Sequence, residues 1–108
     1  MTRGDIITVA LSGDYGKPRP ALVVQSNALP DTDSVLVCLL TSVLREAPLY
    51  RLDGPADEST GLRVPSQVMA DKPVTIRRER IGQKIGRLGN QDMARLNAAL
   101  AFVLGLAD

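Results

Sequence analysis

The residue whose type and setting best suit chemistry is Arg19, in the segment Lys17-Pro18-Arg19-Pro20 directly before an apolar stretch. Pro18 fixes its own φ and Pro20 favours an extended backbone at Arg19, so the guanidinium would project from a stiff segment. A guanidinium presents a planar pair of donors to a phosphate and stabilises the charge of a pentacoordinate phosphorane. The alternative is an ordinary surface arginine at the start of a strand.

A second candidate is Thr41, which ends the apolar run of residues 35–40. By parity it shares a strand face with Val37 and Leu39, so its hydroxyl would donate to a phosphate oxygen at the mouth of a cleft. Thr at a strand end is also simply a good β-former. Asp71 stands beside Lys72-Pro73, where turn chemistry explains it, and Cys38 is expected to be a small core residue.

The composition excludes several other chemistries. The chain has no His, one Cys and three aromatic residues. A Ser-His or Cys-His nucleophile pair, a cysteine-rich zinc site and an aromatic platform for stacking bases are therefore not expected. The sequence has no Gly-rich phosphate loop and no carboxylate pair at useful spacing, so we expect no cofactor and no metal. No signal peptide or membrane span is visible, and the free thiol fits a reducing cytoplasm.

The elements that must position Arg19 and Thr41 are short strands. The length of 108 residues predicts a single domain spanning residues 1–108. Turn residues mark loops at 12–18 and 27–33 and an exposed, mobile loop at 53–61. The segment 81–88 is ambiguous because Gly82 and Gly86 weaken a helix there. Apolar and β-rich patterns predict strands at 6–11, 21–25, 35–44 (buried on both faces), 49–52, 64–69 and 74–76.

The last element is predicted to be a helix with Asn90 as its N-cap and Gly105 at its end. Met93, Leu96, Leu100, Val103 and Leu104 recur at helical spacing. Several strands followed by one helix predict a mainly β (α+β) fold, a small antiparallel, barrel-like sheet with a C-terminal helix packed on it.

Charge is distributed unevenly along the chain. Its net charge is +1, but residues 63–87 carry seven basic and two acidic side chains. A basic segment of this kind favours polyanions, because each phosphate that it neutralises releases counterions. A solvated face on which Glu79 pairs locally with the arginines is the alternative.

Three segments give the chain a resemblance to a known family. They are Arg3-Gly4-Asp5-Ile6-Ile7, then Lys17-Pro18-Arg19-Pro20 with the strand after it, and Leu39-Leu40-Thr41-Ser42. Weaker support comes from Ser66-Gln67-Val68, Asp71-Lys72-Pro73 and Ile85-Gly86-Arg87-Leu88. In this order and spacing the sequence resembles the MazF/PemK (Kid) toxins of bacterial type II toxin–antitoxin modules, almost from end to end.

The resemblance implies an SH3-like β-barrel and a homodimer. It also implies a sequence-specific, metal-independent endoribonuclease of the mRNA interferase type, which cuts single-stranded mRNA, arrests growth, and uses the RNA's own 2′-hydroxyl as the nucleophile. A cognate antitoxin would lay an acidic C-terminal tail over the active-site groove. Arg19 would stabilise transition-state charge and Thr41 would hold the scissile phosphate. Substrate-binding residues would be Asp14, Tyr15, Lys17, Ser42, Asp71, Arg77 and Arg78.

Two alternatives accompany this interpretation. One is a non-enzymatic gyrase poison on the same fold, like CcdB, although that branch acts through a C-terminal Trp and this chain has none. The other is a small SH3-like binding module without activity. The sequence also departs from the PemK branch, since Met69 stands where that branch has an Arg.

Overall fold

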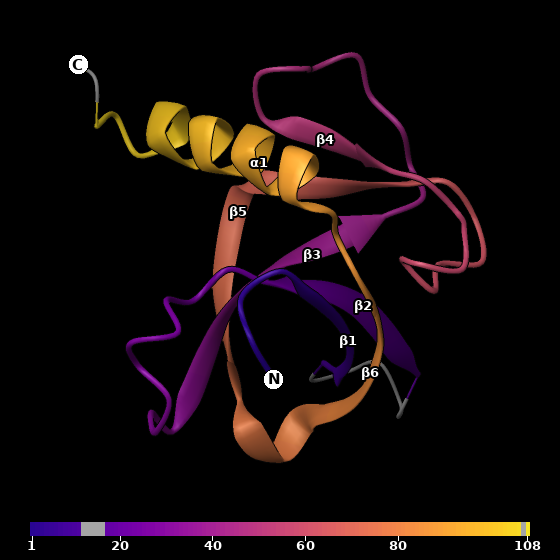
Figure 1. Cartoon of the computed structure of the whole chain (residues 1–108), viewed down its shortest axis with the longest axis vertical. Helices are drawn as coiled ribbons and strands as arrows, with labels where there is room; N and C mark the ends of the chain where they lie inside the picture. The colour runs from indigo at the N-terminus through magenta and orange to yellow at the C-terminus, as the bar shows by residue number, and fades with distance from the viewer. Residues whose placement is uncertain (12–16, 107) are drawn as a thin grey trace.

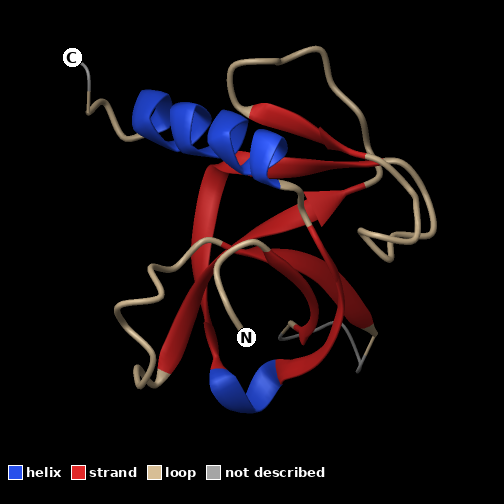
Figure 2. Ribbon diagram, viewed as in Figure 1, coloured by secondary structure: helices blue, strands red, loops and turns tan. Residues whose placement is uncertain are grey.

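The computed structural model of the chain describes residues 1–11, 17–106 and 108. Six strands form one sheet in which every described pairing is antiparallel, in the order β4-β5-β3-β2-β1-β6. The fold is mainly β with one C-terminal helix, as predicted, and the barrel-like sheet is not closed (Figure 1, Figure 2). The elements are β1 (Asp5–Ala10), β2 (Pro18–Val23), β3 (Ser34–Thr41), β4 (Arg51–Gly54), β5 (Ser66–Arg77), the 3₁₀ turn η1 (Arg78–Arg80), β6 (Ile81–Arg87) and α1 (Asn90–Val103).

In β1, β2 and β3 two buried apolar clusters use residues of opposite parity, because successive side chains of a strand point to opposite faces. One cluster includes Ile6 and Cys38 and is covered by Met93, Leu96 and Ala99 of α1. The second is formed by strand residues that include Ile7, Val37 and Ile76. The central strand β3 contributes to both clusters, which confirms its prediction as a strand buried on both faces.

The two strands predicted around Pro73 are one strand, β5. Its pairing with β3 shifts register, since Cys38 lies opposite Pro73 and Leu40 lies opposite Val68. Two steps along β3 therefore correspond to five steps along β5, and the additional residues bend β5. Before this bend, Gln67 and Val68 pair with β3 on one side and with β4 on the other. Pro73 is tolerated at this irregularity because a regular ladder of hydrogen bonds is interrupted there.

Three local predictions are corrected by the structure. The helix begins at Asn90, and the N-cap position is Gly89, whose backbone is extended and whose carbonyl accepts the bond from the Met93 N–H. The ambiguous segment at 81–88 is strand β6, paired with β1. The loop predicted at 53–61 begins inside β4, and its Thr60 side chain is only 3 % exposed.

The segment after β4 packs closely against β6 through Gly61. Its φ is +70°, which L side chains rarely adopt, and a Cβ there would lie 1.9 Å from the Ile85 carbonyl oxygen. The adjacent Ser59 carbonyl accepts a 2.8 Å hydrogen bond from the Arg87 N–H. Glycine at this position therefore allows the 55–62 segment to cover the sheet edge at β6.

Candidate active site

The strand registers place Arg19 and Thr41 on one face at the same end of the sheet. In β2 and β3 the paired residues are Val23 with Val37, Leu22 with Cys38, and Ala21 with Leu39. The pairing between the two strands ends at Ala21 and Leu39, and Arg19 and Thr41 each lie two residues beyond it. Because every second residue of a strand points to the same face, Arg19 and Thr41 share the face of Ala21 and Leu39.

The same row continues across the next two strands. Thr41 lies opposite Gln67 of β5, and Gln67 lies opposite Asp53 of β4. Thr41, Gln67 and Asp53 therefore follow one another across three neighbouring strands. Successive strands are about 4.8 Å apart, so this row is roughly 10 Å long, and Arg19 lies on the same face of the next strand, β2. The arrangement gives one face of the sheet a guanidinium, a hydroxyl, an amide and a carboxylate.

The hydroxyl of Thr41 is orientated by the turn that follows β3. Its Oγ1 accepts a 3.1 Å hydrogen bond from the Val43 N–H, and its side chain is only partly exposed. Because the oxygen accepts this bond, the O–H remains able to donate to a phosphate oxygen. Ser42 is exposed immediately beyond it.

The buried Gln67 amide fixes the segment that joins β3 to β4. Its Oε1 accepts from the Arg45 N–H at 2.9 Å, and its Nε2 donates to the Arg45 carbonyl at 3.0 Å and to Asp53 Oδ1 at 3.2 Å. Both polar groups of the Arg45 backbone are thus satisfied by one side chain. The sequence interpretation gave Gln67 no role, although an amide inside a predicted strand was a signal that could have found it.

Asp71 lies inside strand β5 and not in the turn predicted beside Lys72-Pro73, and it forms an ion pair with Arg51. The Arg51 Nε donates to Asp71 Oδ1 at 2.9 Å and its Nη2 to Oδ2 at 3.3 Å. The side chains are 6 % and 24 % exposed, respectively. This hydrogen bond lowers the pKa of the Asp71 carboxyl, so the group is charged at neutral pH. Arg51 faces Met69 across the β4–β5 pair, so a guanidinium from the neighbouring strand lies beside Asp71.

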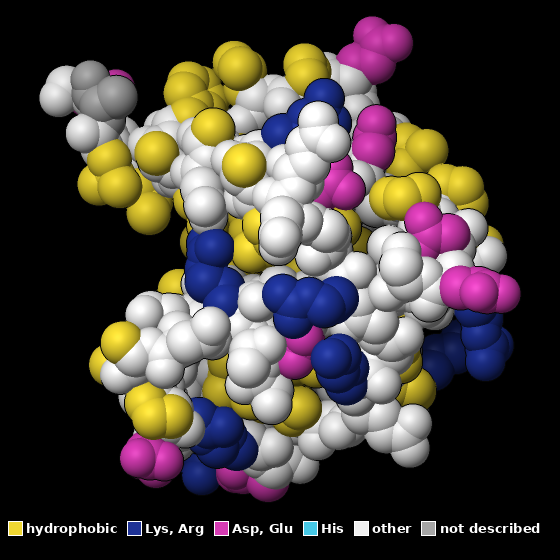
Figure 3. Space-filling view, viewed as in Figure 1, with side chains coloured by type: hydrophobic (Ala, Val, Ile, Leu, Met, Phe, Trp, Pro, Cys, Tyr) yellow, Lys and Arg dark blue, Asp and Glu magenta, His cyan; other side chains and the backbone are white. Residues whose placement is uncertain are grey.

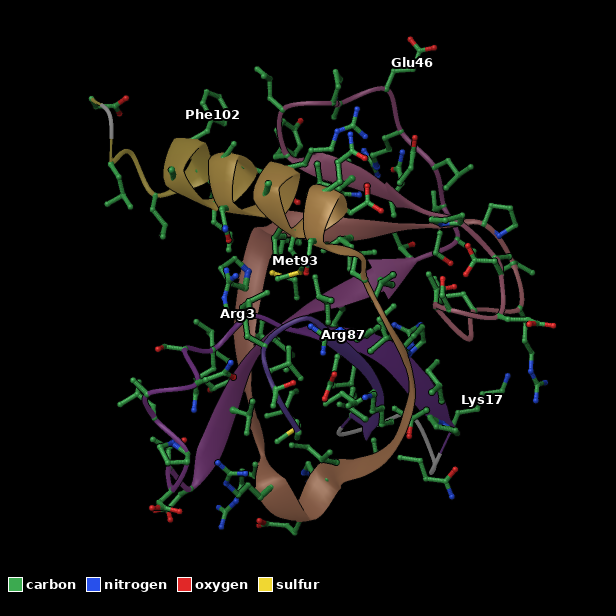
Figure 4. All side chains as sticks on the ribbon, viewed as in Figure 1. Arg3, Lys17, Glu46, Arg87, Met93 and Phe102 are labelled. Atoms are coloured by element: carbon green, nitrogen blue, oxygen red, sulfur yellow. The ribbon has the colours of Figure 1, made fainter. Side chains whose placement is uncertain are left out.

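The remaining predicted binding residues divide into two groups. Lys17 is exposed directly before β2 and lies near the Arg19 end of the sheet (Figure 4). Arg77 and Arg78 lie at the other end of β3, since Arg77 pairs with Ser34. An eight-residue strand separates them from Thr41 by roughly 24 Å. Asp14 and Tyr15 lie outside the described residues.

Part of the basic segment is engaged within the chain. Arg78 donates to the Pro30 carbonyl at 2.8 Å and to the Thr32 carbonyl, and so ties down the β2–β3 loop. Arg77 pairs with Glu79 at 2.7 Å, as the alternative of a solvated face had suggested, and the pair is exposed. Cationic side chains nevertheless gather on the face shown in Figure 3, between α1 and the lower strands.

Two cations of that face bind a buried carboxylate. Arg87 Nη1 and Lys84 Nζ lie 2.8 and 3.4 Å from Asp5 Oδ1, whose side chain is 3 % exposed. Burial acts to raise the pKa of Asp5, but the Thr2 N–H, Lys84 and Arg87 outweigh it and lower the pKa. The Arg-Gly-Asp segment at the N-terminus therefore anchors β1 to β6.

Cys38 is a core residue, as predicted. Its side chain is fully buried, and burial, with a smaller contribution from the Asp71 charge, raises the pKa of its thiol to about 11. A nucleophilic cysteine needs the thiolate, so this environment does not favour one. Among the described residues no group of three His, Cys, Asp or Glu side chains could hold a metal ion. No helix in the described ranges has the length and hydropathy to cross a membrane.

The fold is a twisted antiparallel sheet with a C-terminal helix packed on one of its two apolar clusters, and known proteins share it. The sequence model of the PemK-like, MazF-like toxins of type II toxin–antitoxin systems matches residues 2–104. The chain belongs to this family.

Individual relatives span nearly the whole chain. It is 42 % identical over 108 residues to the probable endoribonuclease MazF of Mycolicibacterium smegmatis, covering 99 % of each chain. It is 34 % identical over 93 residues to endoribonuclease MazF4 of Mycobacterium tuberculosis, covering 85 % of this chain and 83 % of that one. A mycobacterial endoribonuclease solved in complex with its cognate antitoxin superposes with a TM-score of 0.80 at 30 % identity, covering 98 % and 96 %.

Proposed function

We propose that this protein is the toxin of a type II toxin–antitoxin system and that it cleaves single-stranded RNA as a sequence-specific, metal-independent endoribonuclease. The observation that supports the catalytic part is that Arg19 and Thr41 share one sheet face, each two residues beyond the last pair between β2 and β3. The endoribonucleases among its relatives support the class of reaction.

In this reaction the substrate supplies the nucleophile. The 2′-oxygen attacks the adjacent phosphorus, the P–O5′ bond breaks, and the products are a 2′,3′-cyclic phosphate and a 5′-hydroxyl. The 2′-hydroxyl loses its proton and the departing O5′ gains one. The Arg19 guanidinium binds the non-bridging oxygens, whose charge grows in the phosphorane, and the Thr41 hydroxyl donates to one of them. Arg19 acts electrostatically, since a guanidinium retains its proton throughout the physiological range.

Partners follow from the same assignment. The solved relative in complex with its cognate antitoxin supports an antitoxin partner for this chain. An acidic tail would complement the cations at the Arg19 end of the sheet. We also propose a homodimer, supported by exposed apolar side chains that include Leu49, Phe102 and Leu104.

The test uses the purified protein and RNA in the presence of a chelator. We expect cleavage to persist and to leave 2′,3′-cyclic phosphate and 5′-hydroxyl ends. A substrate with a single 2′-deoxy substitution at the cut should resist cleavage. Loss of activity in chelator, or cleavage of the deoxy-substituted site, would exclude the mechanism. Gyrase trapping without RNA cleavage would favour the gyrase poison instead, which the comparisons do not support.

A further inference from the structure

A cavity of about 550 Å³ opens at the Asp53 end of the catalytic row. It is lined by residues 44–48 and by Arg51, Asp53 and Gln67. Its size lies within the range of small-molecule sites, and Leu44 and Pro48 give it apolar surface. No step of the proposed cleavage uses this cavity.

The polar groups at the cavity are mostly committed to partners. Arg51 is held by Asp71 through two hydrogen bonds, and Gln67 uses its oxygen and both amide hydrogens on Arg45 and Asp53. Asp53 differs from them. It is exposed, and within the part of the chain that the structure describes it accepts one hydrogen bond, from Gln67. A carboxylate has about four lone-pair positions, so Asp53 retains acceptor capacity that points to a ligand with donors.

The cavity carries charges of both signs, since Arg45, Arg51, Glu46 and Asp53 line it. At Asp53 itself the carboxylate attracts the donor edge of a base and repels a phosphate. Single-stranded RNA is recognised through splayed bases that pack on side chains and form hydrogen bonds along their Watson–Crick edges. Glu46 also lines the cavity, but Asp53 is the carboxylate that lies in the row with Thr41 and that Gln67 orientates.

We propose that Asp53 recognises a guanine base of the RNA, an inference that rests on the endoribonuclease function proposed above. The Watson–Crick edge of guanine carries two adjacent donors, N1–H and the N2 amino group, and both match the two oxygens of one carboxylate. Adenine and cytosine place an acceptor beside their single amino donor, and uracil places its N3–H between two carbonyl groups. A charged carboxylate, which only accepts hydrogen bonds, therefore selects guanine.

The site lies beside the scissile phosphate and does not overlap it. Asp53 is two strands away from Thr41 along the row, at a spacing of roughly 10 Å. The base that it binds thus belongs to a nucleotide close to the cut. Gln67 acts as a positioning residue, because its bonds to Arg45 hold the loop wall and its bond to Asp53 orientates the carboxylate.

The test compares wild type, Asp53→Asn and the control Asp31→Asn on a randomised RNA pool, with sequencing of the cleaved ends. Asp31 is an exposed carboxylate in the loop before β3, at the opposite end of that strand from Thr41. We expect wild type and the control to require guanine at one fixed position near the cut. Asp53→Asn should reduce that preference roughly tenfold or more, with preferences at other positions retained.

A second measurement changes the substrate instead of the protein. Inosine lacks the N2 amino group of guanosine, so replacing that one guanosine should slow wild-type cleavage several-fold and leave Asp53→Asn nearly unaffected. The inference is overturned if active wild type shows no guanine requirement, if Asp53→Asn keeps it, or if inosine is cut as fast as guanosine. Those results would leave the ribonuclease assignment intact, whereas absence of cleavage by wild type would remove both.

Discussion

The ion pair between Arg51 and Asp71 predicts an asymmetry between two substitutions. Asp71→Ala leaves the guanidinium of Arg51, which is 6 % exposed, without its two hydrogen bonds. Arg51→Met removes the buried charge and fills a similar volume, and it leaves a carboxylate that is 24 % exposed and reaches water. An uncompensated buried charge is far more costly than a partly hydrated one.

The magnitudes follow from these exposures. Removing one partner of a buried pair costs about 3–5 kcal/mol, and we take about 3 kcal/mol for Asp71→Ala because the carboxylate side of the pair is partly open to water. For Arg51→Met we expect the free energy of unfolding to fall by about 1 kcal/mol, since the Asp71 carboxylate exchanges its hydrogen bonds to Arg51 for hydrogen bonds to water. With a urea m-value of about 1.5 kcal/mol/M, the unfolding midpoint should fall by roughly 2 M for Asp71→Ala and by less than about 1 M for Arg51→Met.

The assay is urea unfolding followed by circular dichroism at neutral pH. Protein concentration is held equal for all variants and repeated at a second value, because association would shift the midpoint. The reasoning is refuted if Arg51→Met destabilises the protein as much as Asp71→Ala, or if Asp71→Ala shifts the midpoint by less than about 0.5 M. The first result would mean that the cost does not depend on which charge is left without its partner, and the second that the pair contributes little to stability.

Three further predictions concern stability and thiol chemistry. Folding lowers the pKa values of the Asp5 and Asp71 carboxyls. The stabilisation that these charged groups provide is therefore present above the unfolded carboxyl pKa of about 3.9 and is lost as the pH falls through the lowered values. The melting temperature should drop between about pH 5 and pH 2. Cys38 should resist a thiol reagent at pH 8 in the native protein and react at once in urea, and rapid native labelling would contradict its burial. Gly61→Ala should destabilise the folded protein by about 2 kcal/mol or more, because residue 61 has a positive φ and a Cβ there would meet the Ile85 carbonyl. An unchanged melting temperature would show that the 55–62 segment moves freely.

The sequence predicted the elements of the sheet better than their limits. Alternation and apolar runs located most strands because side-chain period is a local property. The sequence predicted two strands where the structure has the single strand β5, because Pro73 locally disfavours a continuous strand. The register shift that accommodates Pro73 depends on the pairing of β5 with its neighbours, which a local pattern does not show. The N-cap was displaced by one residue because Gly89 adopts the extended conformation that Asn90 was expected to have.

For the site, the sequence identified single residues and not their partners. Arg19 and Thr41 were proposed from a stiff backbone and from a strand-end position, and their place on one face of neighbouring strands emerges only from the pairing of β2 with β3. The pairing of Asp71 with Arg51 joins residues 20 positions apart and requires the β4–β5 contact. The basic segment at 63–87 was predicted as one surface, whereas Arg78, Lys84 and Arg87 are partly used for internal contacts.

The most direct test of the central claim is the single-turnover cleavage rate of Arg19→Ala on RNA in chelator, compared with wild type and with Arg95→Ala, an exposed arginine on α1. If Arg19 stabilises the phosphorane, its loss should reduce the rate about 10²- to 10³-fold while the urea midpoint stays close to that of wild type. Arg95→Ala should cleave as wild type does. Wild-type cleavage by folded Arg19→Ala would contradict the assignment of the active site.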